Sequence, residues 1–112
     1  MKMVKAIIRP DFLEPLKDEV LNSDIGGMTV SNVHGCGKQN GWTEYFRGKE
    51  IIMNIVPKVK CEFAVPDDKV DEVVEMVTKV CRTGEVGDGK IFVMPLEDAI
   101  RIRTGETGEA AL

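Results

Sequence analysis

The sequence has little of what most catalytic and metal sites require. It has one histidine, His34, and three cysteines, Cys36, Cys61 and Cys81, without a CxxC pair. An odd number of unpaired cysteines does not suggest a disulfide framework, and these spacings do not match a Cys/His metal site. No Ser/His/Asp or Cys/His set stands out as nucleophile and base. We therefore expect three reduced thiols, mostly buried, and no catalytic residues of these kinds.

Positive charge and long apolar runs are also scarce. The formal net charge is −4, which argues against nucleic acid as the main partner, because phosphate neutralisation requires a basic face. No stretch approaches the roughly 18 consecutive apolar residues of a membrane span. The start, "MKMVKAIIRPD", has too short an apolar run for a signal peptide. We expect a single domain over residues 1–112, cytoplasmic, without nucleic-acid binding or membrane insertion.

The first half of the chain predicts a strand, a helix and a second strand. "MVKAIIR" and "MTVSNVHG" are rich in β-formers. Between them, "LEPLKDEVLNS" places Leu13, Leu16, Val20 and Leu21 at the spacing of an amphipathic helix. Pro15 must then lie in or near the first turn, where a missing N–H is tolerated.

The second half repeats this order. "IIMNIVPKVKCEFAVP" is extended, with Pro57 as an interruption, and "KIFVMPL" is the last strand. In the helix between them, Asp67 or Asp68 is a suitable N-cap, and one face carries Val70, Val73, Val74, Val77 and Cys81. The two units predict an α+β, ferredoxin-like βαββαβ fold, with an antiparallel sheet and both helices on one face. The uncovered face favours a dimer or trimer.

The stretch "TGEVGDGKIF", residues 83–92, places three glycines directly before a strand. From Gly84 to Lys90 it fits the letters G-x-x-x-x-G-K, but Ile91 stands where a P-loop needs Ser or Thr. The glycines also lead from a helix into a strand, the reverse of a P-loop. Two interpretations stay open: a plain turn with a glycine C-cap, or backbone N–H groups that converge on an anion, assisted by Lys90.

Two further clusters favour the anion. "GCGKQNG", residues 35–41, is flexible and basic, and "IRIRTGETG" places Arg101 and Arg103 at alternate positions of an extended segment. Arginine forks suit phosphate oxygens. A solvated edge would explain the two arginines alone, but it explains three such clusters in one small acidic domain less well.

Several separated motifs then resemble one family. "TGEVGDGKIFV", "IRIRTGE", "GCGKQNGWTEYFRG", "PKVKCEF" and "VPDD" closely resemble the PII nitrogen-regulatory signal-transduction proteins, over the whole chain and without gaps. The resemblance implies a homotrimer that binds ATP or ADP in clefts between subunits and binds 2-oxoglutarate together with Mg²⁺ and ATP. It implies a T-loop over about residues 37–55, a B-loop over about 82–90 and a C-terminal segment over about 101–112.

The resemblance also assigns residues by position. The phosphate loop would comprise Gly87, Asp88, Gly89 and Lys90, and the neighbouring subunit would contribute Arg101 and Arg103. The rest of the nucleotide site would comprise Ile7, Thr29, Gly35, Gly37, Lys38, Glu62 and Ala64. Gln39 would complete the Mg²⁺ shell. Lys58 would pair with the distal carboxylate of 2-oxoglutarate, whose site would also include Lys38, Gln39, Gly41 and Gly87.

The T-loop would dock on target proteins, such as an ammonium transporter in the membrane or nitrogen-metabolism enzymes and regulators. Its expected partner contacts are Trp42, Tyr45, Phe46 and Arg47, because aromatic residues anchor interfaces; the alternative is that the loop folds back on its own trimer. Where many members carry a uridylylated tyrosine, this chain has Ile51, and where some carry a phosphorylated serine, it has Lys49. We therefore do not transfer either modification, and we do not assign one to Tyr45.

Two other classes remain as alternatives. One is a small nucleotide-hydrolysing enzyme, although the single histidine has no evident carboxylate partner. The other is a ferredoxin-like RNA-binding module, which would stack bases on aromatic side chains of the sheet. The predicted strands offer only Phe63 and Phe92 for that purpose.

Overall fold

The computed structural model describes residues 1–38, 44–46, 49–51 and 53–112, and the side chains of residues 1–37 and 55–112. The strands are β1 (Lys2–Ile8), β2 (Thr29–Lys38), β3 (Glu44–Phe46), β4 (Lys49–Ile51), β5 (Met53–Val65) and β6 (Lys90–Pro95). The helices are α1 (Leu13–Leu21) and α2 (Val70–Cys81), and short 3₁₀ turns cover Pro10–Phe12, Asp67–Lys69 and Gly108–Ala111.

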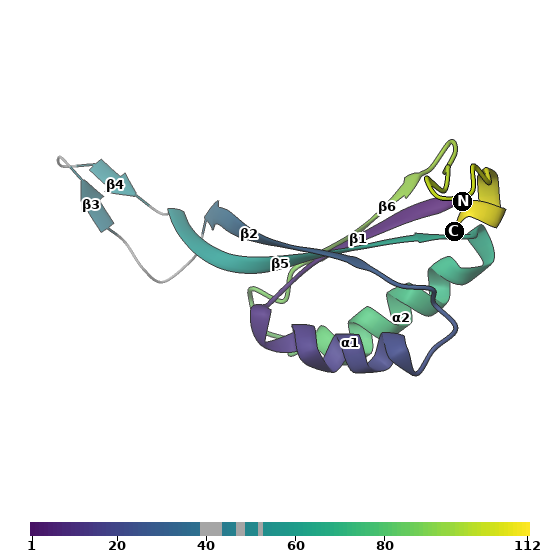
Figure 1. The fold of residues 1–112 in the computed structure, drawn as a ribbon. Coiled ribbons are helices and arrows are strands. Elements are labelled where there is room, and N and C mark those ends of the chain that lie inside the picture. The colour runs from purple at the N-terminus through teal and green to yellow at the C-terminus, as the bar shows by residue number, and fades with distance from the viewer. Residues whose placement is uncertain (39–43, 47–48, 52) are drawn as a thin grey trace.

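Four strands form one antiparallel sheet in the order β2-β5-β1-β6. Both helices lie side by side under the same face of this sheet, and the other face is left open (Figure 1). The two β-α-β units thus interlock as the sequence predicted, and the α+β, ferredoxin-like fold is confirmed. Among the described residues, no helix has the length and apolar character that a bilayer crossing requires.

The core lies between the sheet and the two helices. Alternate residues of the central strands point to the helices, because side chains of a strand alternate between its faces. The sheet contributes Val4, Ala6, Ile8, Val59, Cys61, Phe63 and Val65, and the helices contribute Leu16, Val20, Val73, Met76, Val77 and Cys81. Burial raises the pKa of the Cys81 thiol to about 11 and also raises the pKa of Cys61. Both therefore stay protonated at neutral pH, whereas Cys36 is exposed.

Three local predictions were wrong. Leu21 is 80% exposed: it is the last residue of α1, and the buried residues of this helix are Leu16 and Val20. Neither Asp67 nor Asp68 caps α2, because a 3₁₀ turn precedes the helix and Lys69 takes the N-cap position. Pro57 does not interrupt β5: it pairs with His34 of β2 and lies beyond the β1 ladder, so only one neighbouring strand flanks it.

Next to the predicted T-loop, β2 is longer than the sequence indicated, whereas β5 begins at Met53, two residues later than expected. The β2–β5 ladder continues to the pair Lys38–Met53. Beyond it, β3 and β4 form a separate two-stranded ladder in which Tyr45 lies opposite Glu50 (Figure 1). Antiparallel pairing therefore occupies both ends of the segment assigned to the T-loop.

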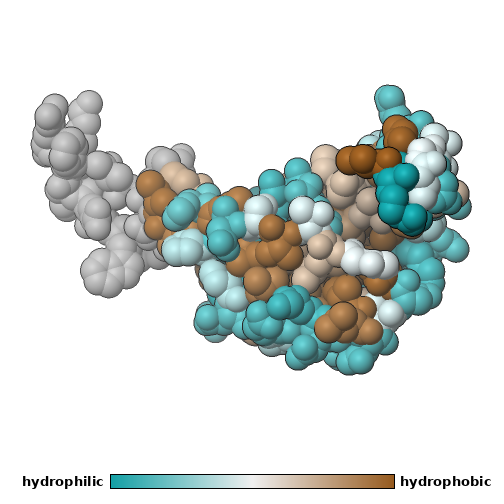
Figure 2. Space-filling model, viewed as in Figure 1, coloured by the Kyte–Doolittle hydropathy of each residue, from teal (hydrophilic) through white to brown (hydrophobic). Residues whose placement is uncertain are grey.

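The open face carries both charged and apolar side chains. On β1, Lys5 lies between Glu62 of β5 and Phe92 of β6. Phe92 is 46% exposed and Met94 36%. Figure 2, viewed from the same side as Figure 1, shows apolar surface, in brown, interrupted by hydrophilic surface, in teal. Phe63, by contrast, is fully buried against the helices, so the open face presents one of the two aromatic rings that an RNA-binding surface would have used.

The glycine stretch allows the chain to cross closely over β1. Gly89 has φ +95°, and a Cβ there would lie 1.7 Å from the carbonyl oxygen of Ile7. Gly87 has φ +102°, and a Cβ there would lie 3.2 Å from the guanidinium of Arg9. Both positions therefore require glycine, and the Gly89 crossing brings Lys90 into register with Ile7 at the start of β6.

We expect Gly89→Ala to destabilise the fold by about 1–3 kcal/mol, because the strained backbone and the overlap with Ile7 act together. Gly26→Ala is the matched control, since Gly26 has no atom within 4 Å of its Cβ position and its φ lies outside the glycine-favouring range. Thermal unfolding of both variants at one protein concentration measures the difference. Equal stability of Gly89→Ala and wild type would contradict the close crossing.

Candidate functional site

Several predicted site residues meet under the B-loop, residues 82–90. Lys58 of β5 donates a 2.6 Å hydrogen bond from Nζ to the carbonyl oxygen of Gly87. Its aliphatic stem passes Gly35 of β2, where a Cβ would lie 3.3 Å from Lys58 Cγ. A small cavity of about 250 Å³ lies beside the same loop and is lined in part by Ile7, Asp88, Gly89 and Lys90. The structure thus brings together residues that were assigned to both the nucleotide and the 2-oxoglutarate sites.

The Asp88 carboxylate holds the loop in shape. It accepts hydrogen bonds from the Thr83 hydroxyl, from the backbone N–H groups of Thr83 (2.9 Å) and Gly84 (2.8 Å), and from the Arg9 guanidinium. The Thr83 hydroxyl, the two amides and Arg9 hold the pKa of Asp88 well below its usual range. Asp88 is therefore ionised at any pH at which the protein works.

Arg9 is a residue of this site that sequence reasoning missed. It lies directly after β1, and its guanidinium reaches Asp88, the Thr83 hydroxyl (3.0 Å) and the Val86 carbonyl oxygen (2.9 Å). The sequence showed Arg9 only as the end of a strand before Pro10. Its partner Asp88 is 79 residues away in the chain, and only the adjacency of β1 and β6 brings the two together.

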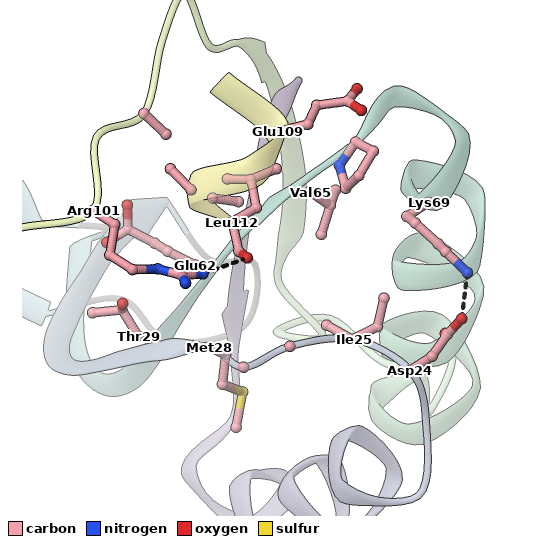
Figure 3. A pocket seen from close by; sticks show the side chains of 16 residues that line it. Asp24, Ile25, Met28, Thr29, Glu62, Val65, Lys69, Arg101, Glu109 and Leu112 are labelled. Carbon is pink, nitrogen blue, oxygen red and sulfur yellow. Dashed lines mark hydrogen bonds and ion pairs between the residues drawn. The ribbon is translucent and has the colours of Figure 1, made fainter. Parts of the chain in front are cut away.

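A second group of predicted residues lines a larger cleft at the C-terminal segment. This cleft has a volume of about 680 Å³, and its walls include Thr29, Glu62, Ala64 and Arg101. Thr29 and Glu62 are direct partners in the β2–β5 ladder. In Figure 3, Arg101 and Thr29 lie at one side of the cleft, and the hydrogen-bonded pair Asp24–Lys69 lies at the other.

The C-terminal segment differs from its prediction. Arg101 and Arg103 were expected at alternate positions of an extended segment, but residues 101–105 form a turn, closed by a 2.8 Å bond from Gly105 N–H to the Arg101 carbonyl oxygen. Arg101 is held within this segment, since it donates to Glu106 Oε1 (3.2 Å) and to the Leu112 carbonyl oxygen (3.1 Å). Arg103 is exposed and does not line the cleft.

The two groups lie at different places on the chain. Lys58 and Glu62 mark them on β5, and four residues of a strand span about 13 Å. Gly37 and the backbone of Lys38 lie farther along β2, at the end that leads to the T-loop. Of the remaining predicted residues, Tyr45 and Phe46 are described only as backbone in β3. Gln39, Gly41, Trp42 and Arg47 lie outside the described residues.

The chemistry of the two groups is complementary. The B-loop group offers cations and backbone donors, which suit an anion. The cleft combines Thr29 and Arg101 with carboxylates, among them Glu62 and Glu109. In the part of the chain that the structure describes, no cluster of three or more His, Cys, Asp or Glu side chains could hold a metal ion.

Comparisons with known proteins identify the family of the chain. The family model "Nitrogen regulatory protein P-II" matches residues 1–106. The chain is 49% identical to nitrogen regulatory protein GlnK of Escherichia coli K12 and 50% identical to nitrogen regulatory protein P-II of Nostoc punctiforme. In both cases the match covers 100% of this chain and 100% of the relative.

Solved structures of Bacillus subtilis GlnK have the same fold. One has a TM-score of 0.83 at 43% identity and covers 99% of this chain and 97% of its own. A GlnK–ATP complex has a TM-score of 0.83 at 40% identity and covers 99% of this chain and 96% of its own. The chain is a nitrogen-regulatory signalling protein rather than an enzyme, and it belongs to the nitrogen regulatory protein P-II family.

Proposed function

We propose that this protein is a homotrimer that binds ATP or ADP in the clefts between subunits and binds 2-oxoglutarate together with Mg²⁺ and ATP. It would then regulate target proteins through its T-loop. The observation that supports this most directly is the division of the predicted nucleotide residues into two groups. Ile7, Asp88, Gly89 and Lys90 line one cavity, while Thr29, Glu62, Ala64 and Arg101 line another.

A cleft between subunits would unite the two groups. The B-loop of one subunit would supply phosphate donors, and the C-terminal cleft of its neighbour would supply Arg101 and the residues around Thr29. The volume of the larger cleft, about 680 Å³, lies within the range that binds small molecules. Support also comes from the B. subtilis GlnK relative, whose structure is described as an ATP complex.

The open sheet face supports the trimer. It presents Phe92 and Met94 at 46% and 36% exposure, and within the described residues β2 and β6 are the edge strands of the sheet, each with one unpaired edge. Closed rotational symmetry around the sheets would bury this face and place each B-loop beside a neighbouring subunit.

We expect sedimentation at micromolar concentration to give a trimer, and Phe92→Glu to shift it towards the monomer. The reason is that a carboxylate on the buried face would lose its hydration without gaining a partner. Leu21→Glu is the matched control, since Leu21 is 80% exposed on a helix, away from the open face. A wild-type monomer under these conditions would contradict the proposed assembly.

The two C-terminal arginines would have different roles. Arg101 already has two acceptors in its own segment, Glu106 and the Leu112 carbonyl oxygen, so its contact with a phosphate requires exchange of these partners. Arg103 is exposed on the single subunit, and its guanidinium has a bidentate fork that suits phosphate. Arg103 is therefore the cleaner test of a contact from the neighbouring subunit.

Arg103→Ala should weaken ATP binding about tenfold to a hundredfold, because a charge-assisted hydrogen bond contributes roughly 1.5–3 kcal/mol. Titration calorimetry measures this, with Lys79→Ala as a control for the loss of one exposed positive charge on α2. Wild-type affinity in the Arg103 variant would mean that this side chain is only a solvated edge residue.

Lys58 is placed to bind a carboxylate. Its ammonium lies under the B-loop at 2.6 Å from the Gly87 carbonyl oxygen, and 2-oxoglutarate would offer a charged acceptor in place of this neutral one. Mg²⁺, held by Gln39 and ATP, would bind the keto-acid end. Because ATP and 2-oxoglutarate would share the metal, each should tighten the other by the same factor.

Lys58→Ala should abolish 2-oxoglutarate binding and largely spare ATP. Calorimetry with ATP, Mg²⁺ and 2-oxoglutarate, separately and together, tests both this variant and the wild type. In the wild type, 2-oxoglutarate should bind well only in the presence of Mg²⁺ and ATP. Equal affinity with and without ATP would contradict the proposed coupling, and absence of ATP binding by the wild type would overturn the function.

Control of the T-loop would follow from ligand occupancy. Ile51 and Lys49 stand at the usual modification positions, and neither has a hydroxyl that could accept a nucleotidyl or phosphoryl group. The loop would respond to whether Gln39, at its base, holds Mg²⁺. A ligand shifts such an equilibrium only by its differential affinity for the two loop states. Targets, an ammonium transporter or nitrogen-metabolism enzymes among them, would then meet Trp42, Tyr45, Phe46 and Arg47 in one state only.

A further inference from the structure

We propose that Arg9 and Asp88 form a positioning pair that shapes the phosphate loop, and that the Asp88 carboxylate itself does not contact the ligand. The inference rests on the proposed nucleotide site and assigns Asp88 a different role from its neighbours in the B-loop. It also adds Arg9, which the sequence did not indicate.

The Asp88 carboxylate has no free acceptor site. A carboxylate has about four acceptor sites on its two oxygens. Oδ1 of Asp88 accepts from Arg9 Nη1 and from the Thr83 hydroxyl. Oδ2 accepts from the N–H groups of Thr83 and Gly84. All the acceptor sites are therefore in use inside the protein, and none is left for a metal ion or a ligand hydroxyl.

Arg9 neutralises the negative charge of Asp88. An ionised carboxylate next to a polyphosphate is repulsive unless a cation neutralises it. Arg9 supplies this cation at direct contact, and both side chains are only about a quarter exposed, at 25% and 24%. The pair can therefore remain ionised beside the phosphates without a net negative charge at that point of the loop.

The backbone and the guanidinium of Arg9 are placed to hold several groups of the loop. Pro10 follows it and favours the extended backbone that Arg9 has, with φ −67° and ψ 142°. From this fixed origin the planar fork reaches three separate acceptors: Asp88 Oδ1, the Thr83 hydroxyl and the Val86 carbonyl oxygen. A lysine has the charge but not the fork, so it would not reproduce these contacts.

Together these contacts fix both sides of the loop. Asp88 engages the N–H groups at its start, the Thr83 hydroxyl accepts from Glu85 N–H (3.1 Å), and Arg9 and Lys58 hold the carbonyls of Val86 and Gly87. Within the described residues, no backbone carbonyl accepts a hydrogen bond from the N–H group of Val86 or of Gly87. With the carbonyls turned to Arg9 and Lys58, these two N–H groups remain as donors for a phosphate.

The pair is tested by a double-mutant cycle with ATP as the probe. Arg9→Ala and Asp88→Asn should each weaken ATP binding tenfold or more, and the double variant should lose less than the sum of the two single losses, because both substitutions remove the Arg9–Asp88 contact. Arg9→Lys should restore only part of the affinity. Lys17→Ala, which removes another surface ion pair (3.3 Å) on α1, should match the wild type.

Three outcomes would contradict the proposed role of Arg9 and Asp88. Wild-type affinity in Arg9→Ala, or tighter binding in Asp88→Asn, would mean that the pair does not position the loop. Fully additive losses would mean that Asp88 acts on the ligand independently of Arg9.

A measurement without nucleotide separates this inference from the proposed function. Hydrogen exchange of the amides of residues 83–87 should become faster in Arg9→Ala and in Thr83→Val, with the amides of β1 and β5 unchanged. Unchanged exchange of the loop would overturn the inference even where ATP binds. If the wild type binds no ATP, the proposed function fails, and faster loop exchange would still support a pair that shapes the loop. Thr83→Val also covers the case in which Arg9→Ala does not fold.

Discussion

The contact of β1 with the loop that enters β6 is the constraint on which the rest of the site depends. Gly89 passes so close to the Ile7 carbonyl that no side chain fits, and Arg9, two residues after Ile7, forms an ion pair with Asp88. Because β1 lies between β5 and β6, the same crossing also brings Lys58 under the loop. The pairing of β1 with β6 thus sets the position of the B-loop, and the shape of the B-loop sets the direction of its backbone N–H groups.

The open face and the divided site are two consequences of one topology. The two β-α-β units put both helices on the same side, which closes the core on that side and leaves the other face with charged and apolar residues. The B-loop and the cleft of Arg101 then lie at different places on the chain, since Lys58 and Glu62, which mark them, are about 13 Å apart along β5. A neighbouring subunit that covers the open face would also complete the site. The same contact between subunits would then both stabilise the assembly and form the ligand site.

The sequence predicted the regular elements well, because periodicity is a local property: Val73, Val77 and Cys81 are buried on α2 as expected. It failed where the outcome depends on distant chain segments. Leu21 continues the apolar pattern of α1 but ends up exposed, and residues 101–105 turn back where alternation suggested an extended segment. Within the candidate site, the family motifs assigned roles to the glycines and to Lys58, and the structure brings Lys58 to the Gly87 carbonyl. The partner of Asp88 was not predictable, since no local pattern links Arg9 to a residue 79 positions later.

The Lys58–Gly87 hydrogen bond gives a physical route between the two proposed ligands. In this structure the Lys58 ammonium stabilises the Gly87 carbonyl of the loop whose N–H groups would bind phosphate. A 2-oxoglutarate carboxylate at Lys58 would compete for the same ammonium, so its binding would change the interactions of the phosphate loop as well as its own. This coupling through Lys58 would add to the coupling through a shared Mg²⁺ ion. Linkage requires that each ligand change the affinity of the other by the same factor. Arg9 also lies near Gly87, but its acceptors are other groups of the loop, on Thr83, Val86 and Asp88. The loop would therefore keep its shape while one of its two supports changes partner.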